Sequence, residues 1–200
     1  MRSRLLFAAA LLAMPLLLLG GCVAPTGPVE VTRFHLPDTR MLGHGAISVE
    51  AAPGTDGASL EVRSFTAAVA RELQRVGYRE AAGGQVAEVR LERRTYQATR
   101  NRSPVSVAAG GSTGSYGSGV GLGVGIDLSG PPPAMIETLL GVMIRDGATR
   151  AVLWEGRASF AVRVDSPLAT TQLGAAQMAA ALFKDFPGNS GETVLIKPAK

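Results

Sequence analysis

The sequence predicts an α+β fold in which two helices pack on one face of a mainly antiparallel sheet, preceded by a cleaved lipoprotein signal peptide. Three observations lead to this prediction. Several segments alternate apolar and polar residues with a period of two, which is typical of half-buried strands. Two other segments carry apolar residues at helical spacing. The chain opens with a short positive segment, a long apolar run and two glycines before its single cysteine.

Residues 1–21 have the organisation of a secretory signal peptide. Met1 to Arg4 carries two positive charges, and Leu5 to Leu19 is an apolar run that two glycines follow. The run is shorter than the roughly 20 residues that a bilayer span needs, and Pro15 interrupts it. A retained membrane anchor is the alternative interpretation of this segment.

The end of the apolar run, Leu19-Gly20-Gly21-Cys22, resembles a lipobox. The resemblance implies that the sulfur of Cys22 is acylated and that cleavage makes Cys22 the first residue of the mature chain. Two or three acyl chains hold a protein stably on a membrane. Val23, where an aspartate would retain the protein at the inner membrane, implies outer-membrane sorting, with the domain facing the periplasm. The alternative is an ordinary signal peptide with a chance cysteine at its boundary.

Composition limits the partners and the stabilising devices of the mature chain. The length favours one domain, which we place at residues 29–200. A single cysteine means that no internal disulfide stabilises it. The net charge of +4 falls to +2 when Arg2 and Arg4 leave with the signal, which argues against a nucleic-acid partner. The densest basic stretch, from Arg90 to Arg102, contains Glu92 and follows Glu88, which predicts a solvated strand face. Its arginines are Arg90, Arg93, Arg94, Arg100 and Arg102.

The first half of the domain is predicted as two strands and a helix. Residues 22–28 hold the lipidated cysteine and a short Pro/Gly tether. Strands are expected at residues 29–36 and 46–51. A helix is expected between Ser59 and Tyr78, with Gly77 as its C-terminal stop. Its apolar stripe consists of Val62, Phe65, Val69, Leu73 and Val76.

The second half is predicted as a strand, a hairpin, a helix and a short strand. A strand covers Gln85 to Thr99. Residues 135–146 and 151–164 form a hairpin around an Asp-Gly turn, with Trp154 and Phe160 as packing residues. Ser166-Pro167 opens a helix that runs to Phe186, and Thr193 to Ile196 is a final strand. We expect these strands to belong to the sheet and the helix to pack on one of its faces.

The middle of the chain is rich in glycine and serine. Residues 108–119 have low apolar content, which favours a mobile loop, and a glycine-faced hairpin is the alternative. From Gly117 to Gly125 every second residue is glycine, which predicts a strand with a glycine-only face. Such a face allows another backbone or a helix to approach closely.

Several of these segments recur together in one group of proteins. They are the lipobox, the early strand containing Phe34, the helix end Leu73-Gln-Arg-Val-Gly-Tyr78, the glycine-rich strand, Leu153-Trp-Glu-Gly-Arg157 and the late helix that runs into Phe183-Lys-Asp-Phe-Pro187. In this combination the chain resembles the DUF4136 family of bacterial envelope lipoproteins. The resemblance spans most of the mature chain and implies an α+β domain in the cell envelope. It implies no reaction, since the family has no established activity.

We predict no catalytic site, metal or cofactor. Gly110 to Gly114 matches the G-x-S-x-G pattern around Ser112, but that motif needs a following helix and a later histidine. Both histidines, His35 and His44, come earlier, and with Asp38 they lack further metal ligands. The acids Glu137, Glu155 and Asp165 are scattered over predicted strands.

The leading hypothesis is therefore a non-enzymatic, lipid-anchored envelope protein that binds or scaffolds an unknown envelope protein. The alternative is an accessory lipoprotein of a lipid or lipopolysaccharide transport system, which rests on fold-level analogy. A third class, a hydrolase, depends on Ser112 alone.

Overall fold

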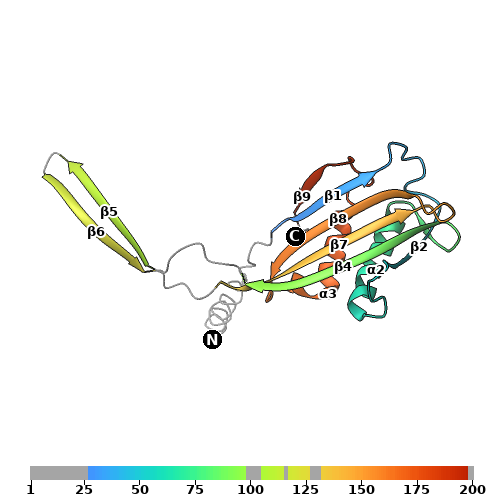
Figure 1. Ribbon diagram of the computed structural model, residues 1–200, viewed down its shortest axis with the longest axis horizontal. Helices are drawn as coiled ribbons and strands as arrows, with labels where there is room; N and C mark the ends of the chain where they lie inside the picture. The colour runs from blue at the N-terminus through green and yellow to red at the C-terminus, as the bar shows by residue number, and fades with distance from the viewer. Residues whose placement is uncertain (1–26, 98–104, 115–116, 127–131, 198–200) are drawn as a thin grey trace, which may run out of the picture.

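The structure, a computed structural model, describes residues 27–97, 105–114, 117–126 and 132–197 (Figure 1). The signal peptide at 1–21, the lipobox from Leu19 to Cys22 and Arg100 and Arg102 of the basic stretch lie outside these ranges. Those sequence expectations stay predictions. Across the described part of the chain, no helix has the length and hydropathy needed to span a bilayer.

Within the described ranges, a seven-stranded sheet, a separate two-stranded sheet and two α-helices make up the fold. The strands are β1 (Val29–His35), β2 (Ala46–Ala51), β3 (Arg79–Glu80), β4 (Gln85–Gln97), β5 (Val105–Gly114), β6 (Gly117–Ile126), β7 (Ala134–Arg145), β8 (Val152–Arg163) and β9 (Thr193–Ile196). The helices are α2 (Leu60–Arg75) and α3 (Thr171–Leu182), and a short 3-10 turn covers Pro167–Ala169.

The large sheet is mixed, so the expectation of a mainly antiparallel sheet is wrong. Its order is β3-β2-β4-β7-β8-β1-β9. β2 runs parallel to both β3 and β4, whereas the pairs β4–β7, β7–β8, β8–β1 and β1–β9 are antiparallel. The reason is that α2 follows β2 and returns the chain to the same end of the sheet, and such a helical crossover joins parallel strands.

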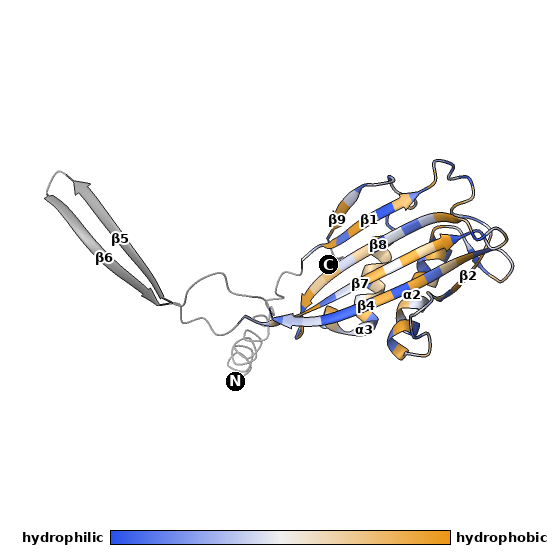
Figure 2. Cartoon of the chain, in the orientation of Figure 1, coloured by the Kyte–Doolittle hydropathy of each residue, from blue (hydrophilic) through white to orange (hydrophobic). Residues whose placement is uncertain are grey.

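Both helices contact each other and the same side of this sheet, so the α+β expectation is confirmed (Figure 1). The inward residues of the strands form the core with the helices, because alternate residues of a strand point to the same face. Figure 2 shows the resulting alternation of hydrophobic and hydrophilic residues along β1 and β4. The largest buried side chain is that of Trp154, which stacks on Phe183 with ring centroids 5.4 Å apart.

The two helices differ in how closely they follow the sequence prediction. α2 begins after Ser59 and buries Val62, Phe65, Val69 and Leu73, as the stripe predicts. Ser166-Pro167 opens only the 3-10 turn, because Thr170 is extended (φ −68°, ψ 140°) and interrupts the helix. α3 therefore starts at Thr171 and ends at Leu182, four residues before Phe186.

The glycine-rich segment forms a hairpin, so the preference for a mobile loop over residues 108–119 is wrong where the structure describes them. β5 and β6 pair antiparallel from Val105↔Ile126 to Gly114↔Gly117. The period-two alternation predicted a strand from Gly117 to Gly125, and β6 covers this segment. The hairpin is a sheet of its own, and neither strand pairs with any described strand of the large sheet.

The prediction of a solvated face for the basic stretch is wrong for Arg93, whereas Arg90 and Arg94 are exposed. Arg93 lies on the inward side of β4, where its guanidinium pairs with Glu61 at the start of α2. The same guanidinium donates a hydrogen bond to the carbonyl oxygen of Ala169, 2.8 Å away. Arg93 therefore links β4 to the beginning of α2 and to the turn before α3.

Candidate functional site

The outward face of β4, β7 and β8 carries the candidate site. The register aligns three rows of residues across these strands. The middle row is Arg90, Gly141 and Arg157, and it lies between a row centred on Met143 and a row centred on Leu139. Both helices pack on the opposite side, so no described helix covers these rows.

A shallow hollow of about 560 Å³ lies on this face. Its walls include Glu88, Arg90, Glu92, Arg145, Glu155 and Arg157, together with Leu139, Met143 and the edge residues Ala52 and Pro53. Gly141 lies in the middle of the hollow because it has no side chain to fill the space between its two arginine neighbours. A Cβ added at Gly141 would meet only the Cβ of Arg90, at 3.6 Å. Packing therefore tolerates a side chain here, and the glycine keeps the hollow open.

Ion pairs neutralise most of the charge around the hollow. The buried carboxylate of Glu88 accepts hydrogen bonds from Arg145, at 3.0 Å, and Arg150, at 3.3 Å. Glu155 pairs with Arg157 at 2.6 Å. Arg90 and Glu92 are different, since both are exposed and neither forms an ion pair with any described residue. The arrangement thus presents one guanidinium that is available to an external carboxylate or phosphate.

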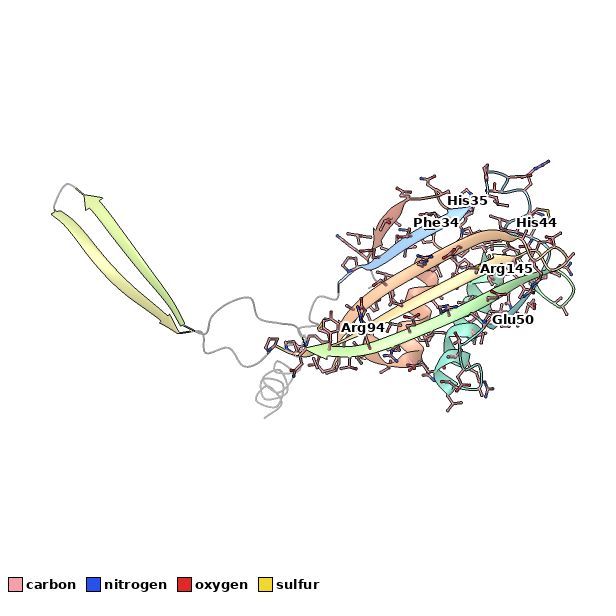
Figure 3. All side chains as sticks on the ribbon, viewed as in Figure 1. Phe34, His35, His44, Glu50, Arg94 and Arg145 are labelled. Carbon is pink, nitrogen blue, oxygen red and sulfur yellow. The ribbon has the colours of Figure 1, made fainter. Side chains whose placement is uncertain are left out.

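The same face continues toward both ends of the sheet. Figure 3 shows Arg94 near the end of β4 and Arg145 near the opposite end of the sheet. Arg94 pairs with Glu137, and this hydrogen bond raises the pKa of the Arg94 guanidinium. Arg163 pairs with Asp165 at 2.7 Å, and its hydrogen bond lowers the pKa of the Asp165 carboxyl group. The acids Glu137, Glu155 and Asp165 are therefore partners of arginines, and the structure does not bring them together as a pair.

The two histidines have local structural roles. The ring of His35, at the end of β1, lies 2.7 Å from the carbonyl oxygen of Leu36 through Nδ1 and 3.1 Å from that of Gly188 through Nε2. Nδ1 of His44 lies 3.1 Å from the carbonyl oxygen of Leu42. Asp38, which lies between them in sequence, pairs with Arg40. In the ranges described, no group of three or more metal-ligating residues occurs.

The sequence around Ser112 does not have the context of a nucleophile elbow. That motif places its serine between a strand and a helix. Here β5 continues to Gly114 and β6 begins at Gly117, so a strand follows the serine. The match to G-x-S-x-G therefore belongs to the glycine pattern of a hairpin.

Sequence analysis missed Arg33, a cation in the core. It lies on the inward face of β1 and is 5% exposed. Its Nε and one terminal nitrogen donate hydrogen bonds of 3.0 and 3.1 Å to the carbonyl oxygens of Leu182 and Ala181 at the end of α3. Burial lowers its pKa, an effect that Asp185 and Glu192 oppose. The sequence did contain a signal for this position: Arg33 follows Val29 and Val31 at every second residue, which places it on the same buried face of the strand.

Comparison with known proteins adds relatives without a family assignment. No family model matches this chain. An uncharacterized protein from Zymomonas mobilis subsp. mobilis is 26% identical over 217 residues, which cover 86% of this chain and 81% of that protein. The resemblance to the DUF4136 family stays a prediction.

Two solved structures are distantly similar to this chain. A PDZ domain protein from Parabacteroides distasonis has a TM-score of 0.46 and 11% identity, and the match covers 85% of this chain but only 39% of that one. The PelC dodecamer from Paraburkholderia phytofirmans has a TM-score of 0.43 and 13% identity, with 81% of this chain and 99% of that chain covered.

Proposed function

We propose that this chain is a lipid-anchored protein of the outer membrane whose α+β domain binds or scaffolds an envelope protein and has no enzymatic role. The lipobox that ends at Cys22 supports the anchor. The uncovered face of β4, β7 and β8 supports the binding role, because a broad sheet face with charged and apolar residues suits a protein partner.

The single observation that carries the binding role is the hollow over Gly141 with Arg90 at its side. A partner that places a carboxylate side chain in the hollow gains a charge-assisted hydrogen bond to Arg90. It also contacts Leu139 and Met143, which belong to the walls of the hollow. Arg145 and Arg157 are already paired with Glu88 and Glu155, so the partner's carboxylate binds Arg90 instead.

Proximity labelling in cells tests the partner and its site. The parent chain should enrich at least one envelope protein, and Arg90→Glu should reduce that enrichment several-fold because it repels the same carboxylate. Arg71→Glu is the matched control, since Arg71 is an exposed arginine on α2, on the helical side of the sheet. Recovery of no enriched envelope protein, or an equal loss in both variants, would overturn the proposal.

Metabolic labelling with a palmitate analogue tests the anchor separately. The parent chain should carry the label, and Cys22→Ala should lose it, because Cys22 supplies the only thiol of the chain. An unlabelled parent chain would refute lipidation whatever the protein binds.

The alternative role, as an accessory lipoprotein of a lipid or lipopolysaccharide transport system, calls for an apolar groove that covers acyl chains. The hollow has six charged residues in its walls, which suits a polar partner better. Extraction of labelled lipid from vesicles by the purified protein would favour the transport role.

A further inference from the structure

The composition and length of the glycine-rich hairpin differ from those expected of a hairpin that stands alone in water. A two-stranded hairpin without a third strand or a helix is marginally stable in water. Nevertheless, β5 and β6 pair over ten residues each, and no described strand of the large sheet pairs with either. Residues 103–126 contain no charged residue at all. An exposed edge of this kind normally carries charges or proline that prevent association.

The register divides the hairpin residues into two rows. One row contains the pairs Val105↔Ile126, Val107↔Val124, Ala109↔Leu122, Gly111↔Val120 and Thr113↔Ser118. The other contains Ser106↔Gly125, Ala108↔Gly123, Gly110↔Gly121 and Ser112↔Gly119. Since alternate residues of a strand belong to opposite faces, one face of the hairpin is apolar except for the pair Thr113↔Ser118 near its turn, and the other consists of glycine, alanine and serine.

Ten-residue strands with this alternation match the dimensions of a lipid bilayer. Ten residues extend over about 33 Å, and a strand tilted by about 45° crosses the hydrocarbon core with 9–11 residues. Alternation of apolar and small or polar residues is the pattern of strands that have lipid on one face only. The charged residues Arg102 and Asp127 border the uncharged segment in sequence, where the polar edge of the bilayer would lie.

The hairpin and the proposed anchor leave the large sheet at the same end. Glu30, near the start of β1, is level with Glu92 of β4 through Ser159 and Leu139. β4 then continues toward that end as far as Gln97, after which the chain enters the hairpin segment. Cys22 precedes Val29 by seven residues, which span at most about 25 Å. A lipid on Cys22 therefore holds this end of the sheet near the bilayer.

We propose that the β5–β6 hairpin inserts into the lipid bilayer, with the row of Val105, Val107, Val120, Leu122, Val124 and Ile126 against the acyl chains. This proposal rests on the proposed function, because the lipid on Cys22 is what brings the hairpin close to the bilayer. In hydrocarbon, the outer backbone groups of both strands need hydrogen-bond partners, so insertion brings hairpins of several copies side by side.

Site-directed fluorescence on the lipidated full-length chain tests insertion. Each variant carries one new cysteine. Leu122→Cys and Val124→Cys lie in the apolar row, and Gly121→Cys and Gly123→Cys in the other row are the matched controls. Each carries an environment-sensitive maleimide dye in phosphatidylethanolamine–phosphatidylglycerol vesicles. The dye at the first two positions should shift its emission to shorter wavelength, and nitroxide on the lipid acyl chains should quench it. The dye at the two glycine positions should show neither effect.

The outcomes separate this proposal from lipidation. Water-like emission at all four positions would overturn insertion, and so would burial without quenching, because burial alone indicates protein–protein packing. The parent chain should not react with maleimide, since acylation blocks the sulfur of Cys22. If the parent does react, lipidation has failed, and the same four variants are measured with Cys22→Ala in the same vesicles. Alternating quenching there would still support insertion.

Discussion

Gly156 offers a sharp test of the packing between the sheet and α3. It lies on the inward face of β8, and an added Cβ would be 2.1 Å from Cη2 of Trp154 and 2.8 Å from Cδ1 of Leu182. Carbon atoms in contact normally lie about 3.5 Å apart or more. Gly156→Ala therefore forces the indole ring to move by about 1 Å or more.

The indole ring has little freedom to move. It stacks on Phe183, lies 5.3 Å from the ring of Phe186, and donates a hydrogen bond of 3.0 Å from Nε1 to the carbonyl oxygen of Pro187. Overpacking of a well-packed core typically costs about 1–3 kcal/mol. The reduced entropy of the unfolded chain returns about 0.4–1 kcal/mol. Because the ring is held on three sides, we expect the cost to lie near the upper end of that range, about 3 kcal/mol, which leaves a net loss of about 2 kcal/mol and a fall in Tm of roughly 4–8 °C.

Gly141→Ala is the matched control because it makes the same change on the other face of the same sheet. Its Cβ meets one atom at an ordinary distance of 3.6 Å, so the free energy of unfolding should change by less than about 1 kcal/mol. Urea unfolding and thermal denaturation of both variants provide the measurement. An equal or higher Tm for Gly156→Ala would refute the reasoning, since the ring would then be able to move at no cost.

Three further variants test single interactions. Arg33→Met should lower the free energy of unfolding by about 2–4 kcal/mol, since it leaves two carbonyl oxygens at the end of α3 without their charged donor; urea unfolding measures this, and an unchanged midpoint would contradict it. Burial raises the pKa of Tyr78, so folding favours its protonated form and stability should fall as the pH rises above about 10. Tyr78→Phe should flatten this decline in a series of thermal scans, and parallel curves would count against it. Hydrogen bonding from Thr149 lowers the pKa of Asp146, so its contribution is present above about pH 4 and is lost below. Asp146→Asn should therefore lose less stability than the parent chain between pH 4 and 3, as measured by thermal midpoints.

The sequence predicted the elements well and their arrangement less well. Strands β1, β2, β7, β8 and β9 and helix α2 lie close to their predicted positions, because hydrophobic periodicity is a local property of each segment. The two-residue strand β3 was missed, because it is too short to show a period. The end of α3 was misplaced, because Phe183 and Phe186 contribute to the core from beyond the helix and so extend its apolar pattern.

The candidate site could not be predicted, because its residues come from strands that are distant in sequence. Arg90, Gly141 and Arg157 become neighbours only through the register of β4, β7 and β8. In the sequence, Gly141 is an ordinary glycine within an apolar strand, and Arg90 is one of several arginines. The pairing of Arg145 with Glu88 and of Arg157 with Glu155, which leaves Arg90 available, is also a property of the assembled face.

By itself, the sequence predicted most strands and both helices in their order along the chain, together with export and lipidation, because periodicity and signal motifs depend on residues that are close along the chain. Only the tertiary structure decided that β2 runs parallel to β4, that Arg33 and Arg93 face the helices, and that the glycine-rich segment is a hairpin. The reason is that strand pairing and burial depend on contacts across the sheet, which local patterns do not specify.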